Sequence, residues 1–91
     1  MTDNDPTRVA IHVHRDFDVL IVRIGEDPTE EDLRRALEEC LSQVDGGAER
    51  IVVAGKGMRR PSGAIEAFLR KLHAAVEPGG VTVRVPAPGE P

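Results

Sequence analysis

The sequence predicts a small α/β sandwich of about four strands and two amphipathic helices, in the order β-β-α-β-α-β. Four short segments are rich in Val and Ile, which favour strands. Two longer segments repeat apolar residues at helical spacing. Because strands joined through helices are usually parallel neighbours in one sheet, this order favours right-handed crossovers. A chain of 91 residues has room for a single domain.

Two strands are expected first. Over residues 8–14, Val and Ile alternate with residues that include His12 and His14, so this strand should be half buried. Residues 15–18 suit a turn, and VLIVRI at 19–24 follows as a near-continuous apolar run. Such a run is typical of a strand covered on both faces. The two strands should form an antiparallel hairpin with the first at the edge of the sheet.

The clearest helix signal follows this hairpin. Thr29 can act as the N-cap, and Asp32 stands where a capping box has its acidic partner. Further carboxylates in the first turn interact favourably with the helix dipole. Gly46 and Gly47 end the helix. Its apolar stripe comprises Leu33, Ala36, Leu37, Cys40, Leu41 and Val44.

The second half of the chain repeats the strand–helix alternation. RIVVAG at 50–55 predicts a short buried strand, a second helix should run from about Ser62 to Val76, and VTVRV at 81–85 alternates as a last strand. The domain is therefore expected over residues 8–86. The remaining residues, 1–7 and 87–91, are expected to be a flexible tail and a disordered tail.

Composition narrows the class of function. A net charge of −4 and the lack of Trp and Tyr argue against general nucleic-acid binding, which needs a basic surface and stacking platforms. One cysteine cannot form an internal disulfide, and no apolar run is long enough to span a membrane. We therefore expect a cytoplasmic protein. Since so short a chain has a thin stability margin, a homodimer is an open alternative.

The sequence offers little for catalysis. His12 and His14 share one face of a strand, but a zinc site needs at least a third protein ligand. Cys40 falls in an apolar stripe and is expected to be an inert core residue. No spacing indicates a catalytic triad or a pair of carboxylates. We expect no catalytic residue, no metal site and no cofactor, and an enzyme is the less favoured class.

The loop KGMRRPSG, residues 56–63, is the main candidate for a site. Lys56, Arg59 and Arg60 precede a helix whose exposed N–H groups attract negative charge. The Walker pattern is absent because Lys56 is followed by Gly57 and Met58, and the glycine spacing does not fit the dinucleotide pattern either. A non-standard anion site remains open. We call residues 56–63 the basic loop.

Ser62 has two interpretations. Ser is a preferred N-cap residue, and capping alone would be worth about 1 kcal/mol. Alternatively, the hydroxyl is a phosphoryl acceptor at a strand-to-helix turn. A phosphate there would interact with the helix dipole and with Arg59 and Arg60, and would add up to about two negative charges to a docking surface.

The order of these segments resembles a small STAS domain, the fold of the anti-sigma-factor antagonists. The matching segments are DVLIVRIGE, LRRALEECL, ERIVVAG, PSGAIEAFLRKLHAA and EPGGVTVRV, within about residues 8–86. The resemblance implies a signalling module that binds a regulatory kinase, an anti-sigma factor or a related protein. It further implies that Ser62, which precedes Gly63, is phosphorylated by that kinase.

The sequence departs from the family pattern at this loop. Arg60 stands where the family has Asp, and Pro61 stands where it has a first Ser. The segment between the third strand and Ser62 is short, and the usual C-terminal helix is missing. A member that keeps the interaction surface but lacks the phosphorylation switch is therefore an open alternative.

A second resemblance gives the basic loop a different role. RIVVAGKG before a helix is similar to the Gly-rich strand–loop–helix of small CRISPR-associated ring nucleases, and more remotely to a loop of crotonases. This resemblance implies a small protein that binds nucleotides or cyclic oligoadenylates. Lys56, Arg59 and Arg60 would then hold phosphodiester groups.

Overall fold

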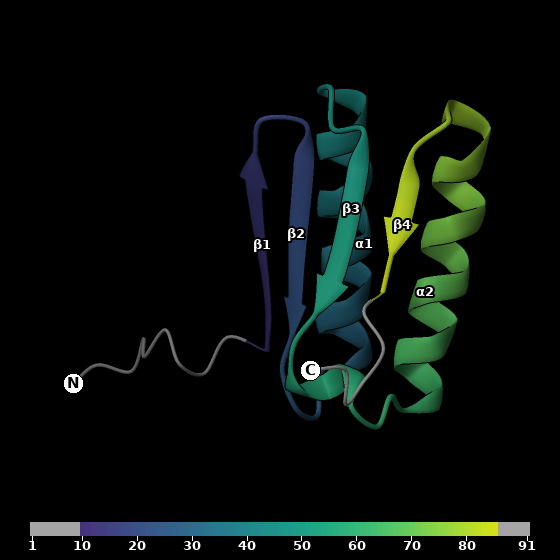
Figure 1. Ribbon diagram of the computed structural model, residues 1–91. Helices are drawn as coiled ribbons and strands as arrows, with labels where there is room; N and C mark the ends of the chain where they lie inside the picture. Colours follow the sequence, from purple (N-terminus) through teal and green to yellow (C-terminus); the bar gives the residue numbers. More distant parts are fainter. Residues whose placement is uncertain (1–9, 86–91) are drawn as a thin grey trace.

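A computed structural model describes residues 10–85 and shows a four-stranded sheet with two helices, in the predicted order β-β-α-β-α-β (Figure 1). The predicted tails, 1–7 and 87–91, and the start of the predicted first strand lie outside the described residues. Within this range, no helix is both long enough and apolar enough to cross a membrane. The α/β class predicted from the sequence is confirmed.

The sheet is mixed, and its strands lie in chain order. β1 (Ile11–Asp16) pairs antiparallel with β2 (Val19–Ile24), which confirms the predicted hairpin and its edge position. β3 (Arg50–Ala54) pairs parallel with β2, and the short β4 (Thr82–Arg84) pairs parallel with β3. Both parallel pairs follow from the helices between their strands, as predicted.

Helix α1 spans Glu30–Asp45 and begins at the predicted capping box. The Asp32 N–H donates to Thr29 Oγ1 at 3.0 Å, and the Thr29 N–H donates to an Asp32 carboxylate oxygen at 2.9 Å. Two N–H groups that the helix cannot satisfy internally thus find partners. Helix α2 spans Gly63–Val76, and the one-turn 3₁₀ helices η2 (Lys56–Met58) and η3 (Glu77–Gly79) flank it.

The core lies between the sheet and the two helices, and Figure 1 shows α1 behind the sheet. Alternate residues of β2 and β3 point into it and are fully buried, because successive side chains of a strand face opposite sides. Both helices contribute their apolar stripes, as predicted, except that Leu41 is exposed. The buried residues are Leu20, Val22, Ile24, Leu33, Ala36, Cys40, Ala48, Ile51, Val53, Met58, Ile65, Phe68, Leu72 and Val76.

One prediction about β2 is wrong within residues 10–85. The apolar run VLIVRI suggested a strand covered on both faces, but both helices pack on the same side of the sheet. Val19 and Ile21, which point to the other side, are only half buried. We call this other side the helix-free face. It consists of His12, His14, Asp16, Val19, Ile21, Arg23, Arg50, Val52, Ala54, Thr82 and Arg84.

The glycines after β3 allow the chain to lie directly against the end of β2. A Cβ atom at Gly57 would overlap the carbonyl oxygen of Gly25 and come within 2.9 Å of the Ile24 side chain. A Cβ atom at Gly55 would overlap the backbone of Ile24, and Gly55 also has a φ of +117°. Both positions therefore require glycine for packing. Met58, which follows, is buried in the core.

We predict that Gly57→Ala destabilises the fold by about 2 kcal/mol or more, because the obstructing atoms belong largely to backbone that cannot move aside. Gly79→Ala is the matched control, since a Cβ atom there would meet nothing within 4 Å. Its free energy of unfolding should stay within about 0.5 kcal/mol of the unchanged chain. Urea unfolding measures both, and equal stability of the two variants would contradict this account of the loop.

Candidate functional site

The basic loop connects β3 to α2 and presents its cations to solvent. Lys56, Arg59 and Arg60 are all exposed, whereas Gly57 and Met58 between them are buried. The buried pair fixes the loop to the core and leaves the charged side chains outside. Within residues 10–85, none of the three cations makes an ion pair with a carboxylate. The loop can therefore offer positive charge to an external anion.

Ser62 is the N-cap of α2, as predicted. Its Oγ accepts a hydrogen bond from the Ile65 N–H at 3.2 Å, and its carbonyl accepts one from the Glu66 N–H at 2.9 Å. Ser62 itself is exposed, as is Gly63 after it. The hydroxyl thus lies at the positive end of the helix dipole, shortly after Arg59 and Arg60 in the chain. Its phosphorylation stays a prediction.

A shallow groove runs between α1 and α2, close to the start of each helix. Its volume is about 420 Å³, and Lys71 on α2 and Glu30, Glu31 and Arg34 on α1 supply its charged groups. The apolar lining comprises Leu33, Leu37, Ala64, Ala67 and Phe68. The groove begins beside the cap of α2, because Ala64 lies two positions after Ser62.

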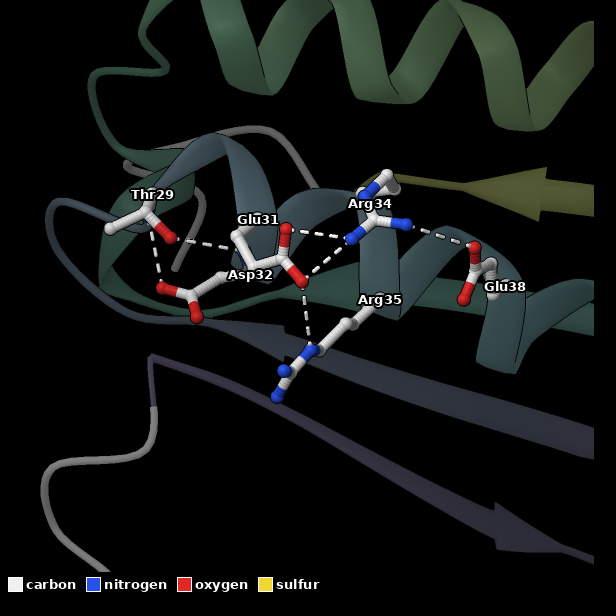
Figure 2. Close-up of polar contacts among 6 residues, drawn as sticks. All are labelled: Thr29, Glu31, Asp32, Arg34, Arg35 and Glu38. Atoms are coloured by element: carbon white, nitrogen blue, oxygen red, sulfur yellow. Dashed lines mark hydrogen bonds and ion pairs between the residues drawn. The ribbon is translucent and has the colours of Figure 1, made fainter.

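The exposed side of α1 carries a ladder of ion pairs, shown in Figure 2. Glu31 bonds Arg34 at 2.7 Å and Arg35 at 3.1 Å, and Arg34 also reaches Glu38 at 3.5 Å. The hydrogen bond from Arg34, and then its charge, lower the pKa of Glu31. All four side chains are largely exposed, so each pair contributes little stability. The ladder does neutralise both arginines of this helix.

The remaining candidates lie apart from the basic loop. His12 and His14 are exposed on the helix-free face, as their spacing predicted. No cluster of three His, Cys, Asp or Glu residues suited to a metal ion occurs among residues 10–85. Cys40 is buried in the core, as predicted. Burial, and then the charge of Glu39, raise the pKa of its thiol to about 12.

Phe17 is a surface feature that the sequence did not single out. It is 89% exposed at the tip of the β1–β2 hairpin, and its φ of +56° is rare for a bulky residue. The Arg15 side chain donates to the Phe17 carbonyl at 2.6 Å and also contacts Gln43 and Gly46 at the end of α1. Arg15 thereby ties the hairpin tip to the helix. The sequence did hold a signal for this exposed residue, because Phe17 is a lone aromatic residue between two Asp residues in a predicted turn.

Comparison with known proteins assigns no family. No family model, no curated protein and no solved structure matches the chain. What can be said of function therefore depends on the fold, the basic loop and the surfaces around it.

We predict that the Cys40 thiol reacts with a thiol reagent only when the chain unfolds, because the reactive thiolate is buried and disfavoured. At about pH 8, labelling followed by mass spectrometry should be slow in buffer and fast in urea. The control is the double variant Cys40→Ala, Ser42→Cys, whose thiol is exposed on the same helix and should be labelled quickly in both conditions.

The raised pKa of Cys40 also predicts a pH dependence of stability. Because the thiol ionises more readily in the unfolded chain, the free energy of unfolding should fall as the pH rises from 9.0 toward about 12.

We also predict that Phe17→Asn raises the free energy of unfolding by about 1 kcal/mol, because Asn tolerates the left-handed backbone far better than Phe. Phe17→Ala removes the exposed ring but keeps the unfavourable backbone, so its gain should be smaller. Thermal or urea unfolding of the two variants separates the effects. Equal changes would show that the backbone at the hairpin tip is not strained.

Proposed function

We propose that this protein is a cytoplasmic protein-interaction module resembling an anti-sigma-factor antagonist, whose partner is a regulatory kinase, an anti-sigma factor or a related signalling protein. The docking surface is the basic loop together with the exposed side of α2. The observation that carries the proposal is Ser62, an exposed residue at the cap of α2, within a loop whose three cations lack intramolecular ion pairs among residues 10–85.

The position of Ser62 suits a switch that acts through charge. A phosphate on its Oγ would gain from the α2 dipole and from nearby Arg59 and Arg60. The same phosphate would cancel the positive charge that the loop offers to a partner. It would also have to lose its bound water when the partner docks, which costs binding free energy. Phosphorylation should therefore release the partner without unfolding the domain.

The interhelical groove supports docking of a protein rather than of a small ligand alone. Its apolar lining from both helices begins next to the basic loop, so one partner segment can contact both. Interfaces of this kind combine an apolar centre with a polar rim. Here Glu30, Arg34 and Lys71 provide the rim.

Two variants of Ser62 test the switch. Asn and Asp are both good N-cap residues, so Ser62→Asn and Ser62→Asp should fold with stability within about 0.5 kcal/mol of the unchanged chain. Only Ser62→Asp adds charge, and it should weaken binding to a cognate anti-sigma kinase, measured by titration calorimetry. Intact-mass analysis after coexpression with that kinase should show one phosphate on the unchanged chain and none on Ser62→Asn.

Two results would count against this role in different ways. An unmodified Ser62, with Ser62→Asp binding as tightly as Ser62→Asn, would reject the switch but keep the docking surface. Unchanged binding of a variant in which Arg59 and Arg60 are both Glu would reject the docking surface itself, because reversing two charges at an interface costs affinity.

The second candidate is a nucleotide- or cyclic-oligoadenylate-binding protein that uses the same loop. The unpaired state of Lys56, Arg59 and Arg60 among the described residues favours an anion. The glycines do not add to this case, because Gly55 and Gly57 serve packing against β2. Thermal unfolding with each nucleotide tests it. A true ligand at 100 times its dissociation constant adds about 2.7 kcal/mol, and no shift at saturation would remove this candidate.

A further inference from the structure

The helix-free face differs from the rest of the surface in two ways. Down its middle, Val19, Ile21, Val52 and Ala54 form a half-buried apolar strip on the two central strands. Around this strip the face carries three arginines, Arg23, Arg50 and Arg84, but only one carboxylate, that of Asp16. The chain as a whole, by contrast, has a net charge of −4. The surface is thus apolar in the middle and basic at its margins.

The register of the strands places these arginines beside the apolar strip. Arg50 lies opposite Val19, Arg84 opposite Val52 and Arg23 opposite Ala54. Neighbouring strands lie about 4.8 Å apart, so each arginine can reach a group that rests on the strip. On β1, His12 lies opposite Arg23 and His14 lies opposite Ile21, so both histidines belong to the same face.

These three arginines differ from those of α1. Arg34 and Arg35 on α1 both pair with Glu31, and Arg34 also reaches Glu38 (Figure 2). By contrast, within residues 10–85 none of Arg23, Arg50 and Arg84 makes an ion pair. All-parallel sheets are usually covered on both faces, and two of the three strand pairs of this sheet are parallel. Charge and architecture therefore both favour an added layer with negative charge.

We propose that an acidic amphipathic helix of a partner protein packs on the helix-free face as a third layer. Its apolar side would cover the strip around Ile21 and Val52, and its carboxylates would pair with Arg23, Arg50 and Arg84. This site is separate from the surface proposed above, since it uses no residue of the basic loop or of α2.

Other occupants fit less well. In a twofold dimer formed through this face, the same patch meets itself, so the arginines of both copies would meet and repel. The outer side of α1 in a second copy is acidic but offers no apolar stripe, because that stripe is buried in the core. A nucleic acid would find no Phe, Tyr or Trp side chain on this face for stacking.

A peptide probe tests the proposal. β2 has six residues and spans about 20 Å, so a helix of about 14 residues covers it. The probe is such a peptide with Leu and Ala on one side and Glu on the other, and its control has Lys in place of Glu. Amide shifts of the labelled protein should move at Ile21, Val52 and Arg84 with the Glu peptide and not with the Lys peptide. The affinity should fall as salt is raised.

Charge reversals on and off this face locate the contact. The variants Arg50→Glu and Arg84→Glu, made together, should bind the Glu peptide at least about tenfold more weakly. Arg35→Glu reverses a charge on the exposed side of α1, outside both proposed surfaces, and should bind as the unchanged chain does. Circular dichroism checks that both variants fold. If either is unfolded, the amide shift changes of the unchanged chain still locate the bound peptide.

Four results would overturn the proposal. The shifts could map to the groove between α1 and α2 or to the basic loop, or the Lys peptide could bind equally well. A DNA or RNA oligonucleotide could bind this face more tightly than the Glu peptide. Sedimentation could show a dimer that the Arg50→Glu and Arg84→Glu variant abolishes. None of these results bears on Ser62, so the two proposals stand or fall separately.

Discussion

The close approach of the chain after β3 to the end of β2 governs where the basic loop lies. Without side chains at Gly55 and Gly57, the backbone passes directly over Ile24 and Gly25 and places Met58 in the core. This contact fixes the first turn after the strand. It therefore sets the point at which α2 begins and the direction in which the basic loop faces solvent. Gly55 and Gly57, which resemble the glycines of a ligand-binding loop, are required by packing and, at Gly55, also by a positive φ.

Much of the fold follows from local patterns. The Thr29–Asp32 capping box, the Ser62 cap and both apolar stripes could be identified because each depends on residues three or four positions apart. The hairpin followed from alternation on β1. The error concerned β2, since an apolar run does not show whether its second face is covered by the same chain or is left open.

The surfaces were harder to predict than the fold. Ser62 and the cations near it could be found because they are adjacent in sequence, and their exposure agrees with that interpretation. Arg23, Arg50 and Arg84 come from three different strands, and only the register brings them to one face. Phe17 escaped notice because its backbone conformation depends on the contacts of Arg15 with the end of α1. Such features depend on tertiary geometry.

The strands lie side by side in the order in which they occur in the chain. No strand has to insert between two neighbours that have already paired, so each one is added to an existing edge. During synthesis from the N-terminus, the strand to which each new strand pairs has therefore already been made. Only the β1–β2 hairpin pairs residues close in sequence, whereas each parallel pair needs the helix between its two strands to be in place. The three-residue β4 can join only after α2 has been made, because it follows α2 in the chain.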